Sequence, residues 1–416
     1  MKEYSIYKNS DIRWIGQIPE SWRLIQLKFL TENHDNKRIP VTAEDRGKMQ
    51  GQYPYYGATG IIDYVNNFLF DGEYLLIGED GAPFFLPQDV AFVASGKFWV
   101  NNHAHILKCK NENNIHFLKY CLNSVDYVEY ITGSTRDKLT QSDLCRIKLP
   151  IPSLPEQQVI ADFLDHKTAQ IDTLIEKKQK QIELLQEEHK ALINHAITKG
   201  LNPKVTMKDS GVEWLDEIPS HWEFVKTKYL FRLVTEKAPD DNEMELLSLY
   251  TEIGVRPRKD LEARGNKAST TDGYWIVKEG DIVVNKLLAW MGAVGYSAYD
   301  GVTSPAYDIL RKTVPLNSKF YHYLLRCGIV LPEFKRRSRG IMEMRLRLYF
   351  DELGQIPLVY PPESEQNQIV EYLEDLEETV NRTISKITKE IELLQEYRMA
   401  LIFESVTGKI DVRTAV

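Results

Sequence analysis

The chain repeats itself at an offset of about 200 residues. Segments 11–30 and 211–230 align without a gap, with paired tryptophans at Trp14/Trp214 and Trp22/Trp222. A second match, at an offset of 209, aligns 182–187 (IELLQE) with 391–396. The middles, roughly 35–135 and 235–340, show little similarity. A unit of about 200 residues therefore occurs twice, alike at its ends and diverged inside. A duplication that drifted everywhere is the alternative, but it leaves the selective likeness of the ends unexplained.

Each repeat closes with a segment typical of one long helix. Residues 156–198 contain no Pro or Gly, and apolar residues recur there at steps of three and four. The first row is Ile160, Leu164, Ile171, Ile175, Ile182, Leu185, Leu192 and Ala196, and the second is Ile369, Leu373, Leu376, Val380, Ile384, Ile387, Ile391, Leu394 and Leu401. A helix this long with a single apolar stripe needs a partner, so we expect the two to pair as an antiparallel coiled coil. Alternatively, each packs separately on its own domain.

The diverged middles indicate mixed domains of short strands and helices. Strands are expected near 61–65, 74–78, 245–250, 274–277 and 281–284, and helices near 115–130 and 318–334. The fold class is α+β: two α/β domains separated by two long helices that form an antiparallel coiled coil, with a pseudo-twofold internal repeat. The expected boundaries are 1–154 for the first domain, 155–200 for its helix, 201–362 for the second domain, 363–408 for its helix and 409–416 for a C-terminal tail.

Composition argues against a membrane-spanning protein and against a zinc or disulfide framework. The sequence has no run of about 18 apolar residues and no apolar N-terminal signal, so we expect a cytoplasmic protein without a membrane span. The four cysteines are too widely spaced for a zinc or disulfide framework. Segments 156–200 and 363–410 together carry the whole net charge of −8. The remaining residues sum to zero and can still present a basic face to a polyanion.

Basic and amide side chains gather in the two middles. Arg and Lys neutralise phosphates and read guanine, whereas Asn suits adenine. A turn at 133–136 (GSTR) offers two hydroxyls and a guanidinium to a phosphate. The candidate DNA-binding residues are Lys37, Arg38, Asn101, His103, Ser134, Thr135, Arg136, Lys138, Arg256, Arg258, Lys259, Lys267, Lys286, Arg336, Arg337, Arg339, Arg345 and Arg347. The alternative for any such run is a solvated surface.

Motifs for catalysis are missing from the sequence. It has no GxxxxGK[ST] loop for ATP and no NPPY or DPPY stretch of an amino-methyltransferase. His103 and His105 lack a Cys or His partner at metal-ligand spacing, so we expect structural roles for them and no metal. Glu79 and Asp80 lie in an expected turn without a nuclease constellation. We therefore expect no catalytic residue and no cofactor in this chain.

Several segments together resemble one known family. They are 14–22 (WIGQIPESW) with its copy 214–222 (WLDEIPSHW), 147–161 (IKLPIPSLPEQQVIA), 53–62 (YPYYGATGII) and 72–81 (GEYLLIGEDG). Over nearly its entire length the chain is similar to the specificity subunits of Type I restriction-modification systems. The resemblance identifies the two globular domains as target-recognition domains.

This resemblance implies a mechanism. Each target-recognition domain reads one half of a split, asymmetric site in double-stranded DNA, and the paired helices fix the spacing. Two modification subunits dock on the repeated regions and methylate adenine with S-adenosylmethionine, and restriction subunits add translocation and cleavage that depend on ATP and Mg²⁺. Two alternatives remain open. One is a non-catalytic coiled-coil scaffold protein without DNA specificity, and the other is a nuclease that uses Glu79 and Asp80.

Overall fold

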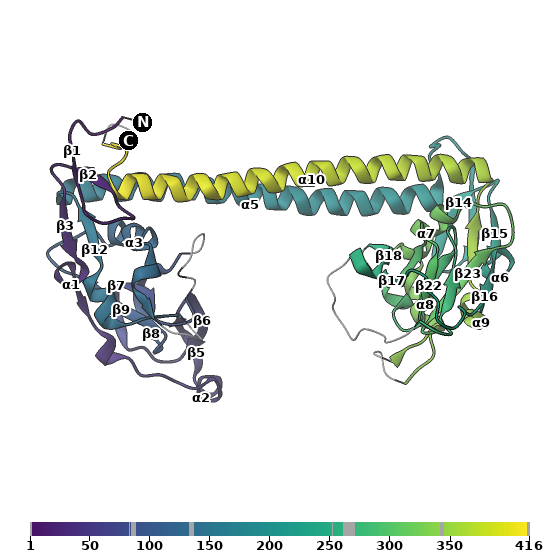
Figure 1. Ribbon diagram of the computed structural model, residues 1–416, viewed down its shortest axis with the longest axis horizontal. Helices are drawn as coiled ribbons and strands as arrows, with labels where there is room; N and C mark the ends of the chain where they lie inside the picture. The colour runs from purple at the N-terminus through teal and green to yellow at the C-terminus, as the bar shows by residue number, and fades with distance from the viewer. Residues whose placement is uncertain are drawn as a thin grey trace. The chain divides into compact units, whose positions relative to one another are not determined.

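The chain forms two compact units that share both long helices. A computed structural model describes residues 2–82, 84, 89–132, 137–251, 253–260, 271–341 and 345–413. Unit 1 consists of Met1–Lys180 and Ile387–Val416, and unit 2 of Gln181–Lys386. Each unit therefore contains one globular domain, the beginning of that domain's own long helix and the end of the other one (Figure 1).

Unit 1 is built on a six-stranded sheet in the order β4-β9-β7-β8-β5-β6. Only β5 and β8 run parallel. The strands are β4 (Thr31–Asn33), β5 (Gln50–Gly57), β6 (Gly60–Val65), β7 (Phe70–Gly78), β8 (Ala91–Val100) and β9 (Ala104–Cys109). The other elements are β1 (Tyr7–Asn9), β2 (Gln17–Pro19), β3 (Arg23–Gln26), α1 (Leu27–Leu30), η1 (Asp35–Lys37), α2 (Ala43–Lys48), α3 (Ile115–Asn123), η2 (Tyr127–Glu129), β10 (Ile131–Thr132), β11 (Lys138–Leu139), α4 (Gln141–Arg146) and β12 (Lys148–Ile151).

Unit 2 is built on a four-stranded antiparallel sheet in the order β16-β23-β20-β21. The strands are β16 (Phe231–Val234), β20 (Ile282–Asn285), β21 (Val294–Tyr296) and β23 (Tyr307–Lys312), joined by the ladders β17 (Leu247–Tyr250) with β18 (Gly254–Pro257) and β19 (Trp275–Val277) with β22 (Gly301–Thr303). The other elements are β13 (Met207–Val212), β14 (Leu215–Pro219), β15 (Glu223–Lys226), α6 (Thr227–Leu230), η3 (Arg258–Asp260), η4 (Ala289–Met291), α7 (Ser318–Arg326), α8 (Leu331–Arg337), α9 (Phe350–Leu353) and β24 (Pro357–Tyr360).

The two expected helical stretches in the middles are both interrupted. In unit 1, α3 ends at Asn123 and a 3₁₀ turn, η2, follows. In unit 2, Cys327 has extended backbone angles, and a new helix, α8, starts at Leu331 with proline in its first turn. Proline is favoured at a helix start because the first N–H groups of a helix have no partner within it. The stretch 318–334 is therefore two helices.

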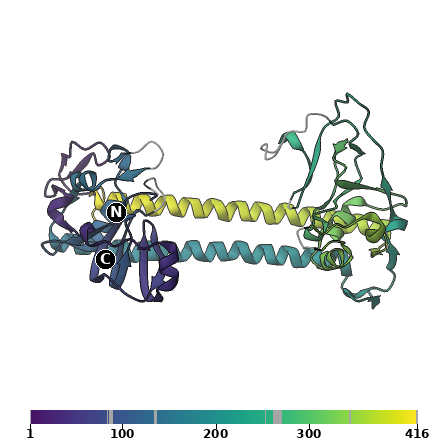
Figure 2. The same cartoon turned by 90° about the horizontal axis from the view of Figure 1, so that it is seen from below.

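The two long helices, α5 (Leu154–Lys199) and α10 (Glu363–Val406), run antiparallel within each unit (Figures 1 and 2). In unit 1 the core includes Leu164 and Ile171 near the start of α5 together with Leu401 near the end of α10. In unit 2 it includes Ala196 near the end of α5 and Leu373 near the start of α10. The predicted pairing of the helices with each other is confirmed, and separate packing on their own domains is excluded.

A buried glutamine repeats at the start of each long helix. In unit 1 the side chain of Gln157 accepts a hydrogen bond from the backbone N–H of Asn114 at 3.0 Å. In unit 2 Gln366 accepts one from Asn317 at 2.9 Å. Each glutamine also donates to the carbonyl oxygen of the proline five residues earlier. Both glutamines are at most 1% exposed, so each satisfies backbone groups that water cannot reach. This buried contact joins the globular domain to its helix in both units.

Each long helix is followed within two residues by a glycine that packs against a tryptophan. Gly408 has a φ of +71°, and a Cβ there would lie 2.4 Å from Pro19 and 3.3 Å from the ring of Trp22 in unit 1. Gly200 has a φ of +76° and lies equally close to Trp222 in unit 2. Only glycine combines this left-handed conformation with so close an approach. The repeated WxxxIPxxW segments therefore receive the end of the helix that begins in the other repeat.

Candidate nucleic-acid interface

The ladders of the two sheets define equivalent positions in the two units. In unit 1 the backbone N–H of Glu79, just past β7, donates to the carbonyl oxygen of His103, just before β9. In unit 2 Lys286, just past β20, makes the same bond to Ala306, just before β23. One step further along the ladder, His105 lies opposite Ile77, and Asp308 lies opposite Val284. Glu79 thus corresponds to Lys286, and His105 to Asp308.

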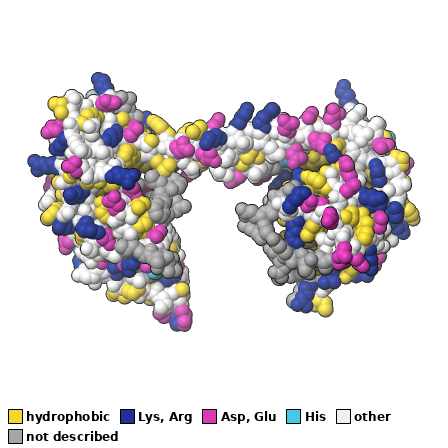
Figure 3. All heavy atoms as spheres, in the orientation of Figure 1, with side chains coloured by type: hydrophobic (Ala, Val, Ile, Leu, Met, Phe, Trp, Pro, Cys, Tyr) yellow, Lys and Arg dark blue, Asp and Glu magenta, His cyan; other side chains and the backbone are white. Residues whose placement is uncertain are grey.

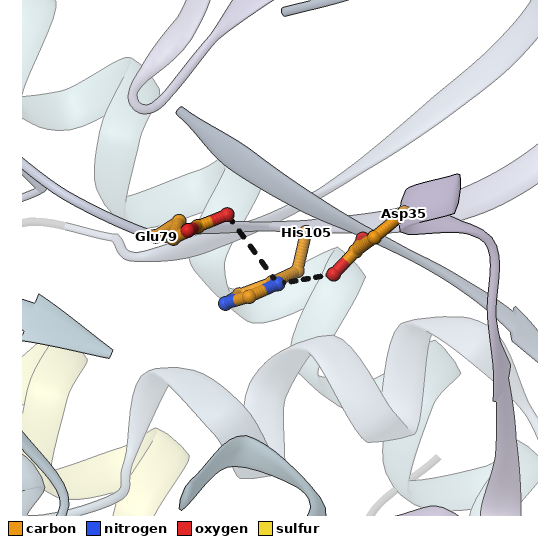
Figure 4. Close-up of side chains that lie close together, drawn as sticks. All are labelled: Asp35, Glu79 and His105. Atoms are coloured by element: carbon orange, nitrogen blue, oxygen red, sulfur yellow. Dashed lines mark hydrogen bonds and ion pairs between the residues drawn. The ribbon is translucent and has the colours of Figure 1, made fainter. Parts of the chain in front are cut away.

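In unit 1 this position holds a network of ion pairs around Glu79. One carboxylate oxygen of Glu79 lies 2.6 Å from the guanidinium of Arg38, and the other lies 3.1 Å from the ammonium of Lys138. The ring of His105 contacts Asp35 at 2.6 Å and approaches Glu79 to 3.8 Å (Figure 4). Since β4, β9 and β7 are neighbours in the sheet, residues far apart in sequence meet here.

The charges of this network are compensated internally. Burial raises the pKa of Asp35 and Glu79, but hydrogen bonds from His105 to Asp35 and from Arg38 and Lys138 to Glu79 outweigh it, so both pKa values lie below the ordinary range. Three groups here, Asp35, Glu79 and His105, have the residue types of a metal site. Their donor atoms are already engaged: both ring nitrogens of His105 face acceptors, Asp35 and the carbonyl of Leu139. The arrangement suits a rigid scaffold better than a metal ligand set.

Four of the residues predicted to bind DNA in the first repeat meet around this network. Arg38 and Lys138 bind Glu79 directly, and the ring of His103 pairs with Asp80. The backbone N–H of His103 donates to the side chain of Asn101 at 2.8 Å, and Asn101 is 7% exposed. The remaining described residue, Lys37, is exposed on the adjoining turn η1, 3.0 Å from a ring nitrogen of His34. Ser134, Thr135 and Arg136 lie outside the described residues.

Unit 2 places the opposite charge at the equivalent position. The ammonium of Lys286 lies 3.3 Å from a carboxylate oxygen of Asp308 and donates to the carbonyl oxygen of Pro305 at 2.7 Å. Burial raises the pKa of Asp308 above its ordinary value, and Lys286 offsets this only in part. The carbonyl oxygen of Lys286 accepts the backbone N–H of Leu348 at 2.9 Å, which ties this turn to the segment that carries Arg345 and Arg347.

Acidic side chains form ion pairs with several residues of the basic run at the end of α8. Glu333, 5% exposed, binds the guanidiniums of Arg336 and Arg337, and these contacts lower its pKa although burial raises it. Arg339 pairs with Asp351 and Glu352. Sequence reasoning missed Glu333, although its spacing of three and four residues from Arg336 and Arg337 was the available signal. Arg345 and Arg347 are exposed.

The last group of predicted residues in unit 2 lies on and beside the β17–β18 hairpin. Arg256 belongs to β18, and Arg258 and Lys259 belong to η3. Lys259 lies 2.5 Å from Glu245, just before β17. Lys267 lies outside the described residues. In Figure 3, Lys and Arg side chains of both units stand among acidic and hydrophobic ones. The predicted residues that the structure describes therefore lie on loops and turns, on the short strands β11 and β18, and at the end of α8.

Comparisons with known proteins agree with this architecture. A family model described as "Type I restriction modification DNA specificity domain" matches twice, at residues 19–184 and 219–393. A Haemophilus influenzae chain that bears the name of a type I restriction enzyme specificity subunit is 28% identical over 382 residues, covering 87% of this chain and 89% of its own length. The Escherichia coli EcoDI specificity subunit is 23% identical, covering 89% and 86%.

Solved structures share the fold. The HsdS subunit from Thermoanaerobacter tengcongensis aligns with a TM-score of 0.52 at 14% identity, covering 94% of this chain and 98% of its own. A chain from a structural study of complex assembly and conformational transition in a type I R-M system aligns at 0.65 and 12% identity, covering 94% and 99%. With both repeats matched, the chain belongs to the Type I restriction-modification DNA specificity family. Among the helices in the described residues, we find none long and apolar enough to cross a membrane.

Proposed function

We propose that this chain is the non-catalytic, DNA-reading subunit of a cytoplasmic Type I restriction-modification complex. Each unit reads one half of a split site in double-stranded DNA, and α5 and α10 set the number of base pairs between the halves. The observation that carries this proposal is the double match to the DNA specificity domain, one match in each repeat. Opposite charges at equivalent loop positions, Glu79 and Lys286, support unlike half-sites.

The partners and cofactors in this proposal belong to other chains. Two modification subunits bind the repeated elements and methylate adenine with S-adenosylmethionine, and restriction subunits use ATP and Mg²⁺. The repeated glutamine contacts of Gln157 and Gln366 give both units a similar helix junction, which suits two copies of one partner. Base choice would come from loop side chains, and exposed Lys and Arg would neutralise phosphates.

Methylome mapping tests the proposal. DNA from the source cell should carry methylated adenines in a split site, and deleting this gene should remove them. A chimaera in which residues 235–340 come from a relative should alter one half of the site and leave the other half and the spacing unchanged. Methylation of an uninterrupted site, or a change in both halves, would contradict the assignment of one half-site to each unit.

A further inference from the structure

The turn between β20 and β21 exposes a compact group of apolar side chains. Leu287, Leu288 and Met291 are 37%, 42% and 52% exposed, and Trp290 between them is half-buried. Single exposed apolar residues are common, but several on one short turn with a polar rim mark an interaction site. We call residues 286–292 the apolar turn.

The apolar turn is held rigidly. The side chain of Asn285 accepts the backbone N–H of Leu287 at 3.0 Å, and the indole of Trp290 donates to the carbonyl oxygen of Leu287 at 3.1 Å. Ala289 is fully buried, and Gly292 closes the turn with a φ of +88°. Because the backbone is fixed at both ends, the exposed side chains are preorganised and lose little entropy on binding.

Cationic residues lie beside this apolar group. Lys286 opens the apolar turn, and the ammonium of Lys335 lies 5.2 Å from the centre of the Trp290 ring. The backbone hydrogen bond between Lys286 and Leu348 joins the apolar turn to the segment that carries exposed Arg345 and Arg347. The carboxylate nearest to Lys286, that of Asp308, is 9% exposed and lies beneath it. An apolar tip with a cationic rim complements a duplex, whose phosphates flank the base edges of its grooves.

We propose that the apolar turn is a base-contacting element of unit 2. Leu288 and Met291 press against the C5-methyl groups of thymine in the major groove, while the flanking Lys and Arg bind phosphates. Thymine is the only base with such a methyl group, so apolar contact there specifies sequence. This assignment rests on the proposed function and adds to it the kind of base that the unit 2 half-site contains.

Binding by the assembled complex tests the assignment. The chain, with its modification subunits, is measured on DNA that contains the mapped site and on scrambled DNA at one salt concentration. We expect Leu288→Ala combined with Met291→Ala to weaken specific binding about tenfold, the factor that ~1.4 kcal/mol produces, and to leave binding to scrambled DNA unchanged. Arg347→Gln should weaken both. Leu233→Ala is the control, because Leu233 is an exposed leucine of the same unit, 37% exposed against 42% for Leu288, but lies on the edge strand β16.

Thymine-to-uracil replacement in the unit 2 half-site removes only the methyl groups. We expect it to weaken binding by the unaltered chain and to have no further effect on the double variant. An equal loss for both chains, or no loss of specific binding in the double variant, would overturn the assignment. If the double variant no longer bound the modification subunits, the apolar turn would be a contact with those subunits, and the assignment to DNA would be overturned as well. Absence of any site preference with the unaltered chain would reject the proposed function itself.

Discussion

The two units place different residues on the same two positions of the same sheet frame, with an acid at the first position in unit 1 and a base there in unit 2. In unit 1 these positions hold Glu79 and His105, and Glu79 forms ion pairs with Arg38 and Lys138. In unit 2 they hold Lys286 and Asp308, which form an ion pair with each other. The charges of Glu79 and of Lys286 are each balanced by partners in the same unit, so the shared sheet can carry either an acid or a base at this position. Recognition surfaces built this way diverge by exchanging whole groups of charges, because exchanging one member leaves the others uncompensated.

Removing one member of each pair should have unequal effects. Glu79→Gln leaves Arg38, whose side chain is 15% exposed, without its shortest carboxylate contact, so we expect unit 1 to lose ~3 kcal/mol of stability. Lys286→Gln should cost only ~1 kcal/mol, because the contact between Lys286 and Asp308 is longer, at 3.3 Å, and only in part offsets the burial that raises the pKa of Asp308. Denaturant unfolding followed by hydrogen exchange on peptides of each unit measures both. Equal losses would show that the reversed pairs are energetically interchangeable.

The repeated glutamines should instead behave alike. Gln157→Ala and Gln366→Ala each remove a buried side chain and leave the partly buried backbone N–H of Asn114 or Asn317 without its acceptor, and we expect ~2 kcal/mol of destabilisation in either unit. Gln158→Ala is the control, since Gln158 is exposed and bonds only the side chains of Asn114 and Asp162; its effect should stay below ~0.5 kcal/mol. The same hydrogen-exchange measurement applies. A loss confined to one unit would show that only one junction depends on its glutamine.

One carboxyl group in each unit should make the stability of that unit depend on pH, and the two dependences should have opposite signs. The folded pKa of Asp35 is lowered, so its stabilisation is complete above about pH 4 and is lost as the pH falls further. The folded pKa of Asp308 is raised, so its contribution favours folding below about pH 4 and is lost as the pH rises.

Asn variants isolate these two contributions. Relative to the unaltered chain, Asp35→Asn should lose stability as the pH rises from 3 to 5, and Asp308→Asn should gain stability over the same range. Melting curves over that range measure both. Parallel curves for the two variants would contradict the opposite shifts.

Sequence periodicity predicted the long helices, because a helix with one apolar stripe needs little information beyond its own segment. The ends of the three-step and four-step rows, such as Leu164 and Leu401 in unit 1 and Leu373 in unit 2, lie in the cores that the helices share with the globular domains. The network of Asp35, Glu79 and His105 was not predictable in this way. Its members come from three strands or turns that are neighbours only through the order β4-β9-β7, and that order is set by packing of the whole sheet.

The basic runs show a second limit of sequence reasoning. A run of Lys and Arg predicts positive charge, but the contacts of each side chain depend on acids that the fold brings near. Arg336 and Arg337 meet Glu333 along one helix, which local spacing could have indicated. Arg339 meets Asp351 on α9, and Arg38 meets Glu79 past β7, and neither is visible from local spacing. Positions of candidate residues are thus more predictable than their partners.

The core of unit 1 is closed by residues that follow unit 2 in the chain. Leu401, Ile402, Val406 and Val412 pack in the same cluster as Tyr4 and Trp22, whereas unit 2 is one continuous stretch from Gln181 to Lys386. On the ribosome, unit 2 can therefore complete its core first, although unit 1 begins at the N-terminus. Domains usually finish folding in the order in which they emerge, and here the order is inverted. A chain truncated before residue 401 would expose an incomplete unit 1, so residues 401–412 must be synthesised before unit 1 can be fully folded.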